Sequence, residues 1–217
     1  MLELFVIAAF GLLAYRSAVI ENEEQTTGTI KVGERIGKLW DIAHLSMREN
    51  RFLRAEKALL TILKIDEKNA AAYNRLGILY AKQKEYRDAI DCFEIASSIE
   101  ATPSSLHNLG LIYFETENYE KAAVAFEQAL KLEDGLAARH VAYAKVQEKL
   151  GNLRLMFEHL EKAAELEPNR ETYSLLLKAY QTAGRAAEAD LLQEKLDKLI
   201  MPAGRRKRIL RPRRVVV

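Results

Sequence analysis

The chain has 217 residues, of which 49% are apolar and 29% charged, with a formal net charge of +2. This composition excludes an intrinsically disordered or fibrous protein, because those classes have few apolar residues or a strong Gly and Pro bias. The single cysteine, Cys92, excludes an internal disulfide framework, so we expect it to pack or to lie half-exposed beside Phe93.

An apolar segment opens the chain. Residues 4–15 carry no charge, and after Arg16 the apolar character resumes to Ile20. A helix over these 17 residues is roughly 26 Å long, slightly short of the hydrocarbon core of about 30 Å, and local thinning accommodates the difference. We therefore expect residues 1–20 to form an uncleaved membrane-anchor helix.

Two other interpretations of this segment remain open, a secretory signal peptide and a helix docked on the first repeat. A signal peptide fits less well, because Glu3 stands where basic residues are expected and no small-x-small cleavage site precedes Glu21, Glu23 and Glu24. A docked helix needs a polar face, which residues 4–15 lack.

The distribution of basic residues predicts the orientation of the anchor. No Lys or Arg precedes it, whereas Arg16, Lys31, Arg35 and Lys38 follow, so we expect the rest of the chain on the cytoplasmic side of the membrane. The alternative localisation is cytoplasmic without an anchor. Residues 21–35 are polar and predict a flexible linker.

Five helical hairpins of nearly constant length occupy residues 36–200. Alignment on residues 36, 70, 103, 137 and 170, at spacings of 34, 33, 34 and 33, brings similar side chains to the same positions. The second repeat shows Leu76-Gly77, Tyr80, Tyr86, Ala89, Phe93 and Ala96, and the third shows Leu109-Gly110, Tyr113, Tyr119, Ala122, Phe126 and Ala129. Such a period predicts stacked hairpins that share one core.

Small residues and turn residues recur within each hairpin. Gly77 and Gly110 allow the first helix to approach the second, and Ala89 and Ala122 do the same from the other side. Turns are predicted at Glu49-Asn50, Lys84-Glu85, Glu117-Asn118, Gly151-Asn152 and Gly184-Arg185.

This pattern resembles the tetratricopeptide repeat (TPR) family over 165 residues. The resemblance implies an all-α fold: a right-handed α-solenoid of about five TPR hairpins, preceded by the hydrophobic helix and followed by a disordered basic tail. The fourth repeat departs from the pattern, with Tyr143-Ala144 and Gln147 in place of Leu-Gly and Tyr. Only Pro168 stands at the usual terminal proline position.

The resemblance also implies a partner-binding groove on the concave surface, formed by the first helix of each hairpin. The predicted groove residues are Trp40, His44, Met47, Asn74, Ile78, His107, Leu111, Phe114, Val141 and Lys145. They suit an amphipathic helix or an extended apolar segment of a protein partner. The clamp that some relatives use for a peptide carboxylate is absent, because Trp40 and His44 occupy its first-repeat positions. The alternative is that Trp40, Leu111 and Phe114 only pack.

No pattern in the sequence predicts catalysis or a cofactor. The four histidines, His44, His107, His140 and His159, lack the i,i+4 spacing or cysteine companions of a zinc site. A phosphate-binding glycine loop and a nucleophile elbow are also absent from the sequence. We therefore expect neither catalytic nor metal-binding residues, no cofactor, and a scaffold rather than an enzyme.

Residues 201–217 form a basic tail. Its seven basic residues are Arg205, Arg206, Lys207, Arg208, Arg211, Arg213 and Arg214. The rest of the chain has 26 basic and 31 acidic residues, so it is net negative. Beside a membrane such a tail predicts contact with anionic lipid. The alternatives are a solubilising tail and an unspecific RNA contact without stacking aromatics, which makes a nucleic-acid or ribosome-associated factor the alternative function.

Two further hypotheses concern the ends of the chain. No capping helix is predicted over Leu191, Leu192, Leu196, Leu199 and Ile200 of the last predicted helix. Either its outer face is polar enough to meet solvent, or two copies pair there, which is the hypothesis. The start, Met1-Leu2-Glu3-Leu4, is similar to the lipopolysaccharide assembly protein B family, whose membrane helix tethers cytoplasmic repeats. That family ends in a cysteine-bearing metal domain, whereas this sequence has a single cysteine and a basic tail, so only the architecture is expected to transfer.

Overall fold

The computed structural model describes residues 31–200, and every regular element within them is a helix. A helix over residues 31–48 comes first. It is followed by α2 (Phe52–Ile65), α3 (Ala70–Gln83), α4 (Tyr86–Ile99), α5 (Pro103–Glu115), α6 (Tyr119–Leu132), α7 (Ala137–Lys149), α8 (Leu153–Leu166), α9 (Arg170–Thr182) and α10 (Ala186–Ile200). The predicted all-α solenoid class is confirmed for these residues.

The predicted membrane anchor, most of the predicted linker and the basic tail lie outside the described residues. Between residues 31 and 200 no helix has the length and apolar character needed to cross a membrane. Residues 31–35, which the sequence assigns to the linker, are helical. The reason is that extending a helix that has already formed costs much less than starting one.

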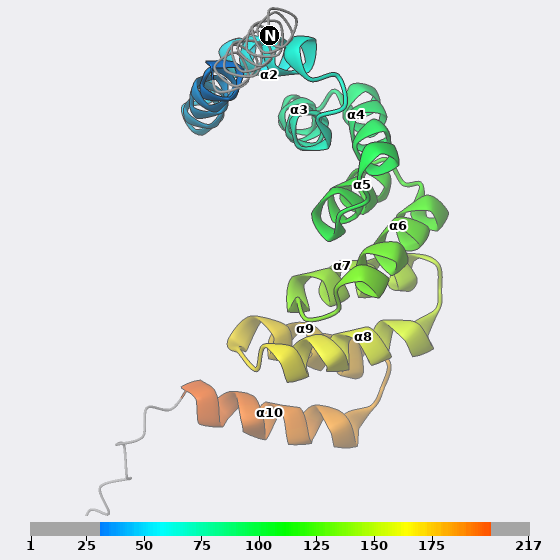
Figure 1. The fold of residues 1–217 in the computed structure, drawn as a ribbon. Helices are drawn as coiled ribbons and strands as arrows, with labels where there is room; N and C mark the ends of the chain where they lie inside the picture. Colours follow the sequence, from blue (N-terminus) through cyan, green and yellow to red (C-terminus); the bar gives the residue numbers. More distant parts are fainter. Residues whose placement is uncertain (1–30, 201–217) are drawn as a thin grey trace, which may run out of the picture. The chain divides into compact units, whose positions relative to one another are not determined.

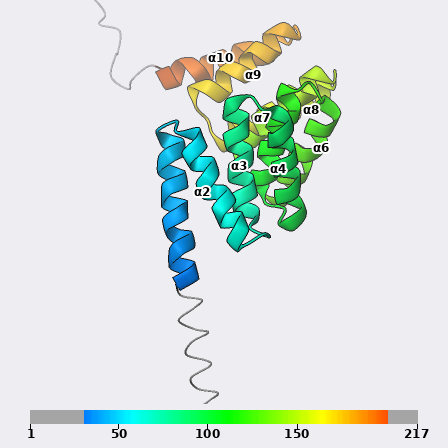
Figure 2. The same cartoon turned by 90° about the horizontal axis from the view of Figure 1, so that it is seen from above.

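The helices form two compact units, one ending at Glu100 and the other beginning at Ala101. In the N-terminal unit, the helix over residues 31–48 packs with α2 and α3 around one core, and α3 pairs with α4 (Figure 2). In the C-terminal unit, α5 pairs with α6, α7 with α8 and α9 with α10, while α6 also contacts α7 and α8 contacts α9 (Figure 1).

Residues of positive φ connect the two helices of each hairpin. They are Asn50, Lys84, Glu117, Gly151 and Gly184, with φ between 57° and 76°. Each belongs to one of the predicted turn dipeptides, which are confirmed as turns. Glycine at two of the five sites removes the steric penalty of a left-handed residue, and the other three carry that penalty at the hairpin turn.

Close approach within the hairpins depends on the two predicted glycines. A Cβ atom built on Gly77 would lie 2.7 Å from the Phe93 ring, and one built on Gly110 would lie 2.9 Å from the Phe126 ring. Both rings are buried, so neither has space to move away. The predicted role of Gly77 and Gly110 is therefore confirmed.

Two tyrosine hydroxyls join neighbouring repeats. Tyr80 Oη donates a hydrogen bond to Glu56 Oε1 at 2.8 Å in the N-terminal unit, and Tyr180 Oη donates one to Glu161 Oε1 at 2.7 Å in the C-terminal unit. Burial, and then the bonded carboxylate, raises the pKa of Tyr180 to about 12, so the hydroxyl keeps its hydrogen at neutral pH. The repeat pattern predicts only a packing role for these tyrosines.

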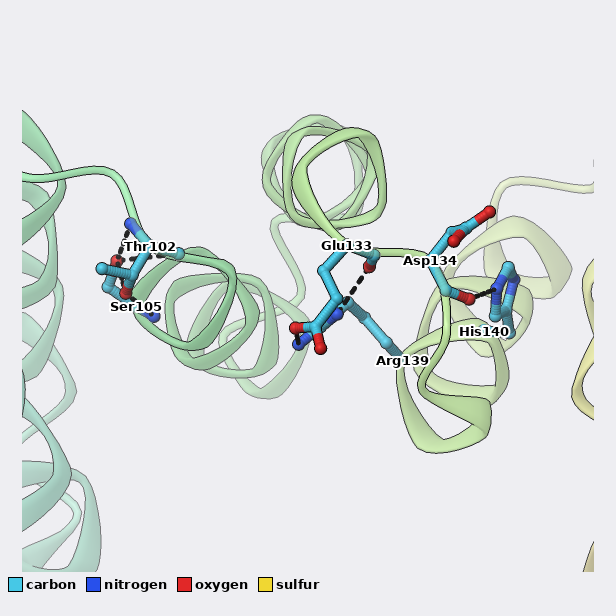
Figure 3. A network of polar contacts seen from close by, with 6 residues as sticks. All are labelled: Thr102, Ser105, Glu133, Asp134, Arg139 and His140. Atoms are coloured by element: carbon cyan, nitrogen blue, oxygen red, sulfur yellow. Dashed lines mark hydrogen bonds and ion pairs between the residues drawn. The ribbon is translucent and has the colours of Figure 1, made fainter. Parts of the chain in front are cut away.

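Polar caps fix the start of several first helices. The side chains of Asn69, Thr102 and Asn169 accept hydrogen bonds from the first turns of α3, α5 and α9. In α5 the cap is reciprocal, because the Ser105 hydroxyl accepts from the Thr102 backbone N–H at 3.1 Å (Figure 3).

Helix α7 starts differently, because its N-cap residue Leu136 has no capping side chain. Two buried side chains reach back to the preceding loop instead (Figure 3). Arg139 donates to the backbone oxygen of Glu133 at 2.6 Å and pairs with its carboxylate at 3.1 Å. His140 Nε2 lies 2.8 Å from the backbone oxygen of Asp134. The loop before α7 is thus held by side chains six residues downstream.

The same histidine links α7 to α8. His140 Nδ1 lies 2.8 Å from His159 Nδ1, and the Tyr143 ring meets the His159 ring edge to face at 4.6 Å. A carbonyl oxygen only accepts, so His140 Nε2 carries the hydrogen toward Asp134. When the His140 ring is neutral, its Nδ1 atom has no hydrogen and accepts one from His159 Nδ1. Burial and the neighbouring His140 lower the pKa of His159.

We expect Gly77→Ala to destabilise the protein by up to about 2 kcal/mol, because overpacking against Phe93 costs about 1–3 kcal/mol and is offset by a gain of about 1 kcal/mol in helix propensity. Gly37 is the matched control, since a Cβ built there meets nothing within 4 Å. Gly37→Ala should therefore stabilise the same unit by up to about 1 kcal/mol. Chemical denaturation of both variants measures the difference, and equal gains would contradict the close-approach constraint.

We expect the free energy of unfolding to fall as the pH drops from 7 to 5. Burial favours neutral His159 in the folded chain, whereas unfolded His159 takes up a proton below its ordinary pKa of 6.5. The stability is therefore complete above that pH and is lost as the pH falls toward the lowered folded pKa. Denaturant titrations at several pH values should show a smaller fall in His159→Asn than in the wild type. The control variant His44→Asn, at an exposed site, should follow the wild type.

Candidate partner-binding groove

Two adjoining cavities lie along the first helices of the C-terminal unit. They have volumes of about 360 and 350 Å³. Four residues from α5, α7 and α9 line both cavities: Phe114, Val141, Lys145 and Leu175. Because the cavities share these walls, they form one continuous groove, which we call the C-terminal groove.

Five of the predicted groove residues line this groove: His107, Leu111, Phe114, Val141 and Lys145. Leu111 is 39% exposed, and Phe114 and Val141 are half-buried, so all three retain surface that a partner can cover. The structure thus brings half of the predicted set together.

The other five predicted residues, Trp40, His44, Met47, Asn74 and Ile78, belong to the N-terminal unit. Trp40 packs against the core of that unit and stacks on His44, with ring centroids 5.6 Å apart. Met47 is only 7% exposed and lies in the same core, which leaves it little surface for a partner. Ile78 also packs against this core, and Asn74 is half-buried.

The walls contributed by α8 were not predicted. Leu153, Met156 and Leu160 of this second helix line the first cavity together with Leu175 of α9. The resemblance to TPR proteins implies a groove formed by first helices only, which excludes α8. Leu175 was not among the predicted groove residues either, although it lies on a first helix, and its apolar character was the available signal.

Charge is unevenly distributed along the groove. The first cavity is lined by Lys145, Lys149 and Lys178 and by a single acidic residue, Glu148. The second cavity shares Lys145 and is lined by the acidic residues Glu115, Glu167 and Glu171. The groove therefore has a basic end and an acidic end around an apolar centre.

His107 in the second cavity is a neutral side chain at physiological pH. Its ring meets the Phe126 ring edge to face at 5.3 Å, and its buried Nδ1 atom has no hydrogen-bond partner among residues 31–200. Burial, followed by the positive charge of Arg139, lowers its pKa. His107 thus lines the cavity as an uncharged ring, and its Nδ1 atom is too deeply buried to reach a partner.

The packing role expected for Cys92 is confirmed. Cys92 packs against the core of the N-terminal unit, and burial raises the pKa of its thiol to about 11. The thiol is therefore protonated at neutral pH, which disfavours nucleophilic chemistry.

Among residues 31–200 no group of three or more His, Cys, Asp or Glu side chains is arranged to hold a metal ion.

The exposed face of α10 is smaller than the sequence predicts. Leu192 and Leu196 are buried in the core of the C-terminal unit, whereas Leu191 and Leu199 are 63% and 51% exposed. Pairing of two copies through this helix stays a prediction, which sedimentation at several concentrations tests.

Comparison with known proteins identifies the repeats. Residues 70–100 and 103–135 match the family model described as tetratricopeptide repeat. No curated protein matches the chain. The similarity to the lipopolysaccharide assembly protein B family stays a hypothesis.

Solved structures extend the likeness to most of the chain. A crystal structure of the MamA protein is 23% identical, with a TM-score of 0.68 over 76% of this chain and 92% of that one. MamA from Desulfovibrio magneticus RS-1 is 15% identical, with a TM-score of 0.64 over 76% and 93% of the two chains. YrrB, described as a TPR protein with an unusual peptide-binding site, is 19% identical, with a TM-score of 0.61 over 72% and 82%. The chain therefore contains tetratricopeptide repeats and has the fold of TPR solenoid proteins.

Proposed function

We propose that the chain is a non-enzymatic scaffold that binds a protein partner in its C-terminal groove and is tethered to the cytoplasmic side of a membrane. The observation that carries the binding proposal is the continuous groove lined by Phe114, Val141 and Leu175. TPR solenoids use surfaces formed by successive repeats to bind other proteins. The peptide-binding site described for YrrB, which shares this fold, supports the same class of function.

The form of the groove favours a linear segment over a globular surface. Its two cavities adjoin along α5, α7 and α9, so a bound segment can place one apolar side chain in each. A few buried apolar contacts carry most of the affinity in such complexes, and polar contacts at the rim set the register. An amphipathic helix and an extended strand both satisfy this requirement.

Membrane tethering rests on residues 1–20, whose only charged side chains are Glu3 and Arg16. A tether restricts the partners to proteins at or near the cytoplasmic face of the membrane. The basic tail supports the same location, because each basic side chain adds about 1 kcal/mol of attraction near an anionic surface.

We expect the double variant Leu111→Ala/Phe114→Ala to weaken capture of the partner at least about tenfold, since each lost contact costs about 1 kcal/mol or more. A detergent-solubilised pull-down with quantitative mass spectrometry measures this loss. Val124→Ala/Leu132→Ala is the matched control, because both side chains are more than half exposed on α6. Equal losses in the two variants, or no loss in either, would rule out the groove as the binding site.

Deletion of residues 1–20 should release the protein from membranes into the soluble fraction. A second truncation after Gly204 separates the contribution of the basic tail. If the first deletion leaves the protein in carbonate-washed membranes, the anchor proposal is wrong. If the second removes ribosomal proteins and RNA from the captured material while the groove variants do not, the alternative of a nucleic-acid-associated factor is favoured.

A further inference from the structure

The basic end of the C-terminal groove contains lysines without anionic partners. Lys145, Lys149 and Lys178 form no ion pair among residues 31–200, whereas Lys131 and Lys162 of the same unit pair with acidic residues on their own helices. All three groove lysines are exposed. Their charge is therefore available to a bound molecule.

The sequence places one acidic residue near these lysines, Glu148, which lies three residues after Lys145 and forms no ion pair with it in the part of the chain that the structure describes. Lys149 lies four residues after Lys145, so the neighbouring positions on α7 carry like charges that repel each other. Lys178 has Ser174 and Thr182 four residues before and after it on α9. An anionic group placed between α7 and α9 would reduce the repulsion between Lys145 and Lys149. It would also attract the charge of Lys178 on α9.

The apolar wall beside the lysines strengthens such a contact. Leu153, Met156 and Leu160 line the same cavity, and this wall excludes water from one side of a bound segment. Attraction between opposite charges increases where water is excluded, provided that both charges keep their hydrogen bonds. In a segment with a carboxylate next to an apolar side chain, the apolar side chain can pack against this wall while the carboxylate pairs with the lysines.

We infer that the partner segment carries aspartate or glutamate side chains beside an apolar residue, and that these carboxylates contact Lys145 and Lys178. This inference rests on the proposed function. The acidic residues Glu115, Glu167 and Glu171 at the other end of the groove repel the same carboxylates. The charge asymmetry therefore fixes the direction in which the segment lies, and it disfavours segments with the opposite charge order.

The test is a selection of twelve-residue random peptides on the full chain in detergent. Each peptide is fused to a coat protein through its C-terminus, so only side chains supply carboxylates. Selected peptides should be enriched in Asp or Glu next to Leu, Ile, Met or Phe. An amidated fluorescent copy of one selected peptide should bind at least about tenfold more weakly to Lys145→Glu/Lys178→Glu. Exchange of its acidic residues for lysine should restore binding to that variant.

The control variant Lys57→Glu/Lys198→Glu makes the same change in net charge at exposed sites outside the groove, and it should bind the peptide like the wild type. The inference is overturned if the selected peptides show no acidic enrichment, or if both charge-reversed variants bind equally. Peptides that lose affinity for Leu111→Ala/Phe114→Ala but not for the lysine variant contradict the inference alone. A selection without any peptide sensitive to Leu111→Ala/Phe114→Ala contradicts the proposed function as well.

Discussion

A helical hairpin of this length buries its apolar face only against other helices, and the distance between those helices depends on small residues at the points of contact. Gly77 faces the Phe93 ring, and Gly110 faces the Phe126 ring, at distances that leave no room for a side chain. The fourth repeat keeps a small residue, Ala144, at the equivalent place, and it is fully buried. These small residues let the two helices of a hairpin pack closely, and the first helix of each C-terminal hairpin contributes residues to the groove.

The sequence period explains how much of this fold was predictable. A repeat of 33 or 34 residues identifies the hairpins, and the turn dipeptides give the positions where the backbone reverses, because both signals are local. Helix α7 has no capping side chain, and the contacts that take the place of a cap join residues further apart in the sequence. Arg139 and His140 hold the loop before α7 across six residues, and His140 meets His159 on the next helix. A repeat pattern that treats each copy alike carries no information about such pairs.

The part of the groove that lies on the first helices was predictable, because local spacing gives the positions of its residues. Positions on the first helices that face away from the second helices include Leu111, Phe114, Val141 and Lys145, and these residues line the cavities. The contribution of α8 depends on how side chains of a second helix reach past the first helix. Sequence spacing does not specify that reach, nor does it specify that Met47 lies in the core.

Charge and shape combine in one surface at the C-terminal groove. Its apolar centre supplies affinity, and the separation of lysines from glutamates supplies direction and selectivity. This combination suits a scaffold that must choose one linear segment among many similar ones. A tether at the membrane would further raise the local concentration of partners at that surface.

Methyl NMR of the full chain during titration with a bound peptide segment tests groove binding most directly. Binding in the groove should shift the methyl signals of Leu111, Val141 and Leu175 and leave those of Leu53, Leu132 and Leu191 unchanged. All three control leucines are more than half exposed, so they would report binding elsewhere. Shifts confined to the control leucines, with the groove signals unchanged, would show that partners bind outside the groove.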